Sequence, residues 1–300
     1  MSTVIEANGL TKFYGKRRGV DGLDLHVNGG EIYGFLGPNG AGKTTTIRIL
    51  LDLIRPNAGS ASVLGSAPRA GGTQLRNRIG YLPGDFVAGG RQSARELLTH
   101  LGHLRGGVPA ERISALADRF DLDLMINVGS LSKGNRQKIG VVQAFMHQPE
   151  LLILDEPTIG LDPLMQQRFL DLVREVKSNG QTVFMSSHVL SEVQQSADRV
   201  GIVREGRMVA VESVETLRRH AVRHVEVHFS EPPPADTLTG VEGVSDVVVI
   251  DSVLRCRSTG RADALVKALA RHDVASLTIQ EPGLEELFFA YYREKAEHAA

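Results

Sequence analysis

Residues 31–46 read EIYGFLGPNGAGKTTT, and this stretch decides the fold. Its apolar run, residues 32–36, predicts a buried strand, and residues 45–53 predict a helix. Between them Gly37, Gly42, Lys43 and Thr44 stand at the spacing G-x-x-x-x-G-K-[ST]. The alternative is a chance glycine-rich turn, and the strand before and helix after argue against it. The stretch therefore predicts a strand, a phosphate-binding loop and a helix.

Each residue type in this loop has a chemical reason. The glycines let backbone N–H groups close around phosphate oxygens, the lysine reaches the β- and γ-phosphates, and the threonine hydroxyl suits Mg²⁺. The helix that follows directs the positive end of its dipole at the anion. We expect nucleotide contacts from the whole loop: Gly37, Pro38, Asn39, Gly40, Ala41, Gly42, Lys43, Thr44 and Thr45.

Composition limits the remaining possibilities. Three hundred residues with 42% hydrophobic content suit one large domain or two ordinary ones. The 34 basic and 35 acidic residues leave a net charge of −1, so the overall balance does not indicate a nucleic acid partner. Cys256 is the only cysteine, which excludes a disulfide framework and fits a reducing compartment. No apolar stretch approaches the roughly 18 residues that span a bilayer, and we expect a cytoplasmic protein.

The chain before the loop predicts short strands. Apolar and polar residues alternate in 3–7 and in 22–27, and a polar turn over residues 14–19 joins the two segments. Tyr14 lies in that turn. Its ring can stack on an adenine base, or it can be an ordinary half-buried tyrosine, and spacing alone does not separate the two.

The chain after the loop predicts strands at 60–64 and 79–82, then a helical block. Ser93 is suited to cap a helix that carries Glu96 three residues on, and a second helix is expected over 110–120. Residues 131–146, LSKGNRQKIGVVQAFM, predict an amphipathic helix with a polar N-terminus. That end can hold a phosphate or simply be capped, and periodicity favours the cap. We place a helical subdomain at about 88–148.

Residues 151–157, LLILDEP, predict a buried parallel strand with Asp155 and Glu156 at its carboxyl end. Asp155 is suited to Mg²⁺, and Glu156 to accepting a proton from water or orienting it. The alternative is a solvated strand end. A helix over 164–177 and a strand over 182–185 follow, and His188 comes just after that strand. A lone histidine usually caps or packs, but at the same edge as Asp155 it becomes a candidate sensor of the γ-phosphate.

The ordered set GPNGAGKTT, LSKGN, LLILDEP, GLD and a later histidine resembles the ATP-binding cassette (ABC) ATPases, over about residues 3–220. Kinases and GTPases lack the signature helix and the adjacent Asp and Glu. The resemblance implies an α/β fold: a P-loop core of ABC type, with a mixed sheet, N-terminal antiparallel strands and a helical subdomain. The ATPase domain is expected over residues 1–220, and the pattern of the chain after it predicts a small C-terminal α/β domain, residues 221–300.

The resemblance further implies two cassettes that clamp ATP and Mg²⁺ between them. Lys43 and Thr44 of one protomer would face Ser132, Lys133 and Gly134 of the other, and Asp162 would lie at the dimer seam. Tyr14 would stack on adenine. Glu156 would be the catalytic carboxylate, and His188 would contact the γ-phosphate. Metal ligation would come from Thr44 and Asp155.

Two features depart from the family pattern. Members usually carry a glutamine after the strand at 79–82, where this chain reads Pro83, Gly84, Asp85. We expect water to fill the metal position there, or Asp85 to substitute. The signature reads LSKGN and lacks the usual second glycine and the glutamine, but it keeps Ser132 and Gly134 and adds the cation of Lys133.

Residues 222–300 predict an accessory domain. HVEVHF alternates as a strand, 244–250 and 253–258 predict a hairpin, and helices are expected at 261–271 and 284–292 around a strand at 275–279. This appendage and the signature resemble ATPase subunits of bacterial ABC-2 exporters, including drug-efflux systems. That resemblance implies a transmembrane permease partner, which would hold this protein at the inner face of the cell membrane. The alternative is a soluble ABC ATPase acting on ribosomes or nucleic acid.

Overall fold

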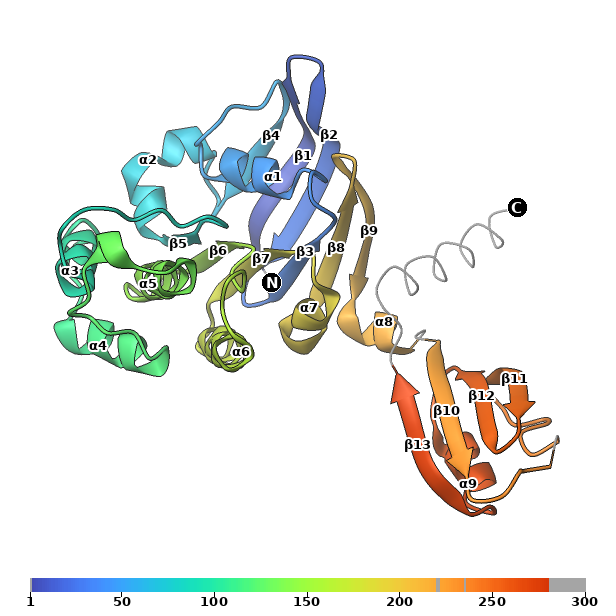
Figure 1. The fold of residues 1–300 in the computed structure, drawn as a ribbon. Coiled ribbons are helices and arrows are strands. Elements are labelled where there is room, and N and C mark those ends of the chain that lie inside the picture. The colour runs from blue at the N-terminus through green and yellow to red at the C-terminus, as the bar shows by residue number, and fades with distance from the viewer. Residues whose placement is uncertain (1, 220–221, 235, 281–300) are drawn as a thin grey trace. The chain divides into compact units, whose positions relative to one another are not determined.

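The computed structural model describes residues 2–219, 222–234 and 236–280, and the chain divides into two compact units, Met1–Glu212 and Ser213–Ala300. Unit 1 is built on a six-stranded sheet in the order β5-β6-β7-β3-β8-β9 (Figure 1). The β5–β6, β6–β7, β7–β3 and β3–β8 pairs are all parallel. The strands are β3 (Ile32–Leu36), β5 (Ile79–Leu82), β6 (Leu151–Asp155), β7 (Thr182–Ser187), β8 (Arg199–Arg204) and β9 (Arg207–Ser213).

A second, antiparallel sheet of unit 1 has the order β2-β1-β4, from β1 (Thr3–Tyr14), β2 (Arg17–Asn28) and β4 (Ala58–Val63). The strands β1 and β2 are much longer than the short strands predicted. Gly9 and Gly22 have φ of 57° and 61°, and the register shifts between Ala7 and Leu10, so the alternation breaks while the strand continues. The Asp24 carboxylate accepts the Gly9 N–H at 2.7 Å.

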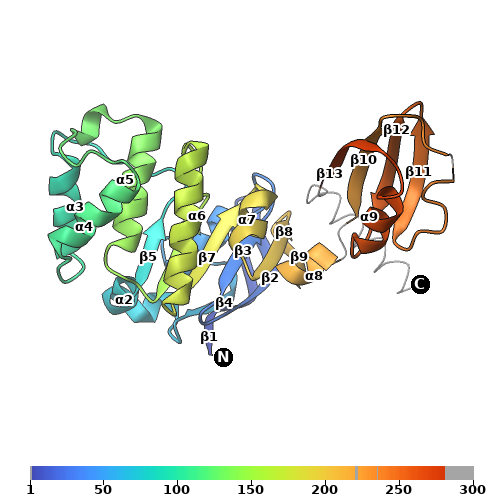
Figure 2. The ribbon, with the colours of Figure 1, turned by 90° about the horizontal axis from the view of Figure 1, so that it is seen from below.

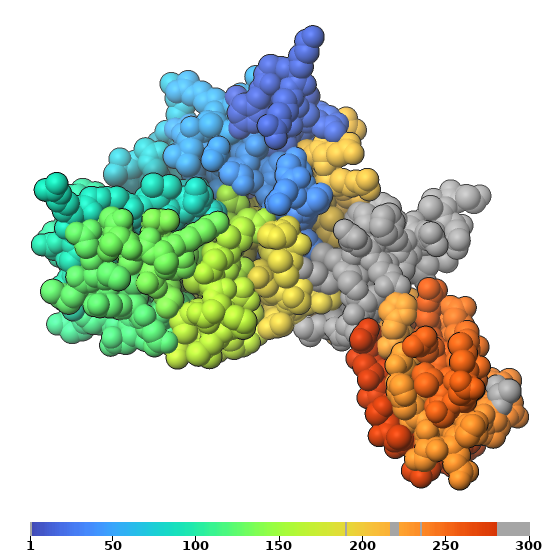
Figure 3. Space-filling view, viewed as in Figure 1, coloured from blue at the N-terminus to red at the C-terminus, as the bar shows by residue number. Residues whose placement is uncertain are grey.

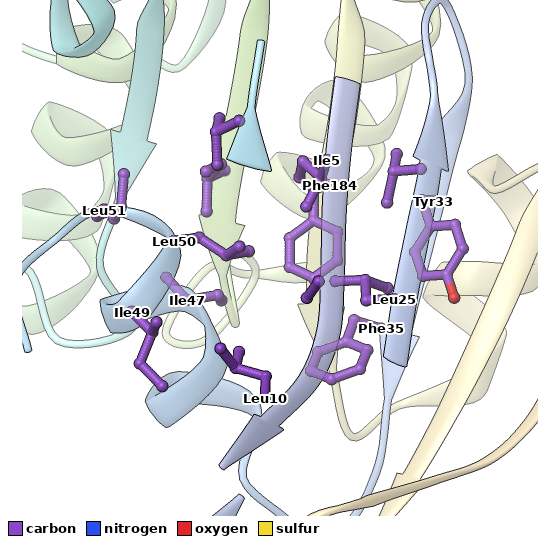
Figure 4. Packing of buried hydrophobic residues seen from close by; sticks show 14 of the residues in the cluster. Ile5, Leu10, Leu25, Tyr33, Phe35, Ile47, Ile49, Leu50, Leu51 and Phe184 are labelled. Atoms are coloured by element: carbon purple, nitrogen blue, oxygen red, sulfur yellow. The ribbon is translucent and has the colours of Figure 1, made fainter. Parts of the chain in front are cut away.

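The helix α1 (Lys43–Leu50) lies between the two sheets. Its Ile47 and Leu50 are fully buried against Leu10 of β1 and against Phe35 and Phe184 of the parallel sheet (Figure 4). Burial of a side chain of this size stabilises the fold by about 1.5–3 kcal/mol. The helix that begins in the phosphate loop is thus held by the main core.

The opposite face of the parallel sheet is covered by α5 (Lys133–Phe145), α6 (Pro163–Ser178) and α7 (Leu190–Ser196) (Figures 1 and 2). Helices α3 (Ala94–His103) and α4 (Ala110–Arg119) pack on α5 and form the helical block with it. Figure 3 shows this block, in green, as a continuous part of unit 1. Ser93 and Glu96 form the predicted capping box. No helix among the described residues is long and apolar enough to cross a membrane.

Side chains from the helical block cover the open edge of the parallel sheet. The edge strand is β5, whose outward carbonyls would otherwise lack partners. Arg105 and His147 both lie within hydrogen-bonding distance of the Ile79 carbonyl, at 3.1 and 3.2 Å, and Gln143 donates to the Tyr81 carbonyl. These contacts join the helical block to β5.

Unit 2 contains a four-stranded antiparallel sheet in the order β11-β12-β10-β13, with α9 (Asp263–Leu269) on one face. Leu265 and Leu269 pack on Val225, Val227 and Leu254. The predicted hairpin is confirmed. The strands are β10 (Arg223–Phe229), β11 (Val244–Ile250), β12 (Val253–Ser258) and β13 (Val274–Gln280), and α8 (Val214–Arg219) precedes them.

Several predicted boundaries are wrong. The helix α1 begins at Lys43 rather than Thr45, because Gly42 at φ 108° turns the loop directly into the helix, and it ends at Leu50 before Asp52 at φ 55°. The helix α2 (Pro68–Asn77) was not predicted, since it contains a glycine pair and is kinked where Gly72 has φ 53°. The elements α7, β8, β9 and α8 were also not predicted. The helix expected at 284–292 lies outside the described residues.

The burial of His147 predicts that the free energy of unfolding depends on pH. Burial, and then the charges of Arg105 and Arg112, lower the pKa of His147 from 6.5 to about 4. The unfolded chain therefore binds this proton more tightly, so the stability is present above about pH 6.5 and is lost as pH falls towards 4. We expect a contribution of about 1–2 kcal/mol, because solvent reaches part of the ring.

Urea unfolding of unit 1 between pH 7.5 and 5 measures this effect. His147→Gln keeps a neutral hydrogen-bond donor and should flatten the pH dependence of the unfolding free energy. His100→Gln, at an exposed histidine of α3, is the matched control. An unchanged pH dependence in His147→Gln would contradict the assignment.

Candidate active site

Strands β3, β7 and β6 end at the same level of the sheet. Leu36 pairs with Ser187, and Asp155 pairs with Ser186. Because the three strands are parallel, the residues that follow each of them emerge at one edge. The phosphate loop, Glu156 and His188 therefore meet there, although they are far apart in the sequence.

The glycines of the loop are required by close backbone contacts. A Cβ at Gly37 would lie 2.3 Å from the Val203 carbonyl oxygen, and one at Gly42 would lie 2.5 Å from that of Gly19. Gly40 and Gly42 have φ of 83° and 108°, backbone angles that residues with a side chain rarely adopt. The loop therefore passes closer to its neighbours than any other residue type allows.

Lys43, Glu156 and His188 form one contiguous group. The Lys43 Nζ is buried, donates to the Gly37 carbonyl at 2.6 Å and lies 2.9 Å from Glu156 Oε1. The other carboxylate oxygen, Oε2, lies 2.6 Å from His188 Nδ1. A carboxylate accepts only, so Nδ1 carries the proton and Nε2 is left as the second ring nitrogen. The structure thus brings together the three predicted catalytic side chains.

The backbone of Glu156 is in an unusual conformation. Its φ is 48°, in the left-handed region, which costs about 1–2 kcal/mol for a residue with a side chain. Its N–H compensates by donating to the Ser186 carbonyl at 3.2 Å and to the Ser186 hydroxyl oxygen at 3.1 Å. This turn, placed directly after β6, directs the carboxylate towards Lys43.

Asp155 and Thr44 have the donor chemistry of a Mg²⁺ site. Asp155 is buried and its Oδ1 accepts the Ser186 hydroxyl at 2.6 Å, which fixes the carboxylate. Thr44 follows Lys43 in the chain and Asp155 precedes Glu156. The ion pair between Lys43 and Glu156 therefore brings these two segments together. A hydroxyl and one carboxylate fit Mg²⁺, which is bound by few protein ligands beside phosphates and water. Burial, and then the charge of Asp155, raise the pKa of the nearby Tyr81 to about 12.

A cleft of about 510 Å³ runs along the loop. Tyr14 lines it, half exposed, and its ring lies close to Gly19, where a Cβ would be 3.0 Å from Cε2. The lining also contains residues that the sequence analysis missed: Arg17, Arg18, Gly19 and Arg48. The turn predicted over residues 14–19 is shorter: Tyr14 ends β1, residues 15–16 form the turn, and Arg17 and Arg18 begin β2. Their position just after Tyr14 was the available signal. Pro38, Asn39, Gly40, Gly42, Lys43, Thr44, Thr45 and Glu156 complete the lining.

The signature residues lie apart from this lining. Ser132 caps α5 by accepting the Asn135 N–H at 3.2 Å, and Ser132 and Lys133 are exposed. Gly134 lies against the backbone of Gly160, where a Cβ would be 2.7 Å from the carbonyl oxygen. Asp162 is exposed and caps α6 through the Met165 N–H at 3.0 Å.

The position of the missing glutamine is occupied by backbone. A Cβ at Gly84 would lie 3.2 Å from the Asp155 carbonyl oxygen and 3.7 Å from its Cγ. Asp85 is exposed. Gly84 is therefore the residue of this segment that lies against Asp155, and a metal role for Asp85 or for water stays a prediction.

Comparison with known proteins identifies the family. The profile described as ABC transporter matches residues 20–159. The bacitracin transport ATP-binding protein BcrA of Bacillus licheniformis is 36% identical over 301 residues, covering 96% of this chain and 97% of the relative. The chain belongs to the ATP-binding subunits of ABC transporters.

Two further matches agree. The daunorubicin/doxorubicin resistance ATP-binding protein DrrA of Streptomyces peucetius is 34% identical over 304 residues, covering 95% of this chain and 91% of the relative. A solved ATP-binding subunit of an ABC transporter is 31% identical with a TM-score of 0.67, covering 72% of this chain and 92% of that one. The predicted ABC cassette fold is confirmed. As an ABC ATPase, the chain binds ATP and hydrolyses it for transport.

The contacts of Ser186 with Asp155 and Glu156 predict that its loss changes the Mg²⁺ dependence of ATP hydrolysis. Ser186→Ala removes the hydroxyl that holds Asp155 and one acceptor of the Glu156 N–H. We expect a several-fold rise in the Mg²⁺ concentration that half-saturates ATP hydrolysis. The free energy of unfolding should fall by about 1–3 kcal/mol, because buried polar groups lose partners.

Titration of ATPase activity with Mg²⁺ at saturating ATP measures this change. Ser178→Ala, at an exposed serine at the end of α6, is the control. An unaltered Mg²⁺ dependence in Ser186→Ala would show that Asp155 needs no support from β7.

Proposed function

We propose that this ABC ATPase drives export of a small drug-like or lipid-like molecule through a separate transmembrane permease. The observation that carries the proposal is the near full-length likeness to proteins named for bacitracin transport and for daunorubicin/doxorubicin resistance. Those alignments extend beyond the cassette and take in unit 2. The protein would then be cytoplasmic and peripheral at the inner face of the membrane.

ATP would lie along the cleft, with adenine stacked on Tyr14 and the phosphates in the loop of residues 37–45. The ring of Tyr14 lines the same cleft as Lys43, which supports this placement. The burial of Lys43 in a low-dielectric site strengthens its attraction to phosphate. Arg17 and Arg48 add positive charge to the same lining.

Glu156 would orient the attacking water and accept its proton, while His188 would contact the γ-phosphate. Glu156 Oε1 lies 2.9 Å from Lys43 Nζ and, among the described residues, has no other partner. That oxygen therefore has a lone pair for a further donor. The neighbouring Lys43 would stabilise negative charge that develops on the phosphoryl oxygens.

Thr44 and Asp155 would hold Mg²⁺. When bound, the ion neutralises phosphate charge and fixes the geometry of the phosphates for in-line attack. The role of this chain is to hold Asp155 still through Ser186 and to present the Thr44 hydroxyl at the start of α1.

We propose that two cassettes close on two ATP molecules. Ser132, Lys133 and Gly134 would reach the γ-phosphate of the partner's ATP, and Asp162 would lie at the seam. The exposure of Ser132 and Lys133, together with their separation from the cleft of their own protomer, supports an action in trans. Gly134 also packs on Gly160 of its own chain, which is an independent reason for a glycine there.

We retain the division into an ATPase domain, residues 1–220, and an accessory domain, residues 221–300, as part of this proposal. In the sequence, the boundary between the two compact units falls slightly earlier, between Glu212 and Ser213. The accessory domain would be a dimer brace or a regulatory lid. No nucleic acid partner is proposed.

Glu156→Gln tests the catalytic assignment. The variant keeps the shape of the side chain but cannot accept the proton, so ATP should be bound without turnover and should trap a stable dimer. We expect a fall in kcat of at least about a hundredfold, measured as phosphate release. Size-exclusion chromatography with ATP and Mg²⁺ detects the dimer.

Glu150→Gln is the matched control, because Glu150 forms an exposed ion pair with Arg78 away from the cleft. It should hydrolyse ATP like the parent chain. Normal phosphate release from Glu156→Gln would transfer the catalytic role to another group.

The transport proposal is tested by purification of the tagged full chain from detergent-solubilised native membranes. A stoichiometric polytopic membrane protein, identified by mass spectrometry, would support the exporter. Ribosomal or DNA-repair proteins without a membrane subunit would favour the soluble ABC ATPase and overturn the transport proposal.

A further inference from the structure

Glu192 is a buried carboxylate that the proposed mechanism does not use. It lies in the first turn of α7, with 9% of the residue exposed. Its Oε1 accepts the Thr158 hydroxyl at 2.7 Å, and its Oε2 accepts the Ser187 hydroxyl at 3.0 Å. Burial of a carboxylate is costly unless hydrogen bonds satisfy both oxygens, so this arrangement needs an explanation.

The contact between Glu192 and Ser187 fixes the segment that carries His188. Ser187 ends β7 and directly precedes His188, and its hydroxyl oxygen also accepts the Val189 N–H at 2.9 Å. The residues on both sides of His188 are therefore held by one hydroxyl. His188 and Val189 are otherwise exposed, so this hydroxyl and its carboxylate partner restrain a surface turn.

The contact between Glu192 and Thr158 fixes the segment that carries Glu156. Thr158 is buried two residues after Glu156, and the Ile159 N–H donates back to the Glu156 carbonyl at 3.2 Å. One carboxylate thus joins the turn after β6 to the turn after β7. These are the two turns whose side chains meet 2.6 Å apart as Glu156 and His188.

We propose that Glu192 is a positioning residue for ATP hydrolysis, which holds His188 against Glu156 by tying Ser187 to Thr158. The inference rests on the proposed roles of Glu156 and His188. A small displacement of such a pair reduces turnover strongly, because the reacting groups must be aligned. Glu192 itself touches neither nucleotide nor water in this role.

A double-mutant cycle on the full chain tests the proposal. The variants are Glu192→Ala, His188→Ala and the double variant, assayed for kcat and KM of ATP hydrolysis. Glu192→Ala should lower kcat about 10- to 100-fold with little change in KM. In the His188→Ala background the same substitution should cost less than about twofold, because the group that it positions is gone.

Glu192→Gln is the conservative variant. Its amide oxygen can accept from Thr158, while its N–H₂ donates to the Ser187 oxygen and the Ser187 hydroxyl turns to the Val189 carbonyl, 3.2 Å away. We expect it to recover most of the activity lost in Glu192→Ala. It also keeps the side-chain volume, so it remains informative if Glu192→Ala folds poorly. Ser191→Ala, at the exposed neighbour in α7, should behave like the parent chain.

The outcomes separate this inference from the proposed function. An equal loss of kcat in both backgrounds would mean that Glu192 does not act through His188, and would overturn the inference while the roles of Glu156 and His188 stand. Full turnover in His188→Ala would remove the proposed role of His188, and the inference with it.

Discussion

The buried ion pair between Lys43 and Glu156 is the interaction on which the site depends. It joins the first residue of α1 to the residue after β6, with 5% and 12% of the two side chains exposed. Two charges are tolerated there only because each compensates the other and further hydrogen bonds satisfy them. The parallel register of β3, β7 and β6 is what brings the two residues together, so the sheet order is itself part of the site.

The backbone around this pair is held in conformations that most residues avoid. Glu156, one member of the ion pair, has φ 48°, and Gly42, which precedes the other member, has φ 108°. Gly37 packs directly on the Val203 carbonyl. Such positions persist only where surrounding structure determines them, as the core under α1 does here. The main hydrophobic cluster therefore supports the geometry of the site as well as the stability of the unit.

The sequence alone predicted the site residues that follow the ends of parallel strands, because binding of phosphate requires charged and glycine residues at that edge of the sheet. Lys43, Glu156 and His188 were predicted and lie together. Ser186 and Glu192 were missed, since their roles arise from side-chain contacts between separate segments and no single stretch reveals those contacts. The helix α2 was missed because Gly71 and Gly72 interrupt its local pattern, and tertiary packing outweighed that propensity.

The segment after β5, which lacks the usual glutamine, lies against Asp155 through its backbone. The block is joined to β5 through Arg105, Gln143 and His147, and β5 leads directly to Gly84 beside Asp155. Phe86 extends this connection, because it lies where a Cβ on Gly140 of α5 would meet its Cγ at 2.9 Å. Among the described residues, the contacts between the helical block and the neighbourhood of Asp155 therefore consist of backbone and packing contacts through β5 and Phe86.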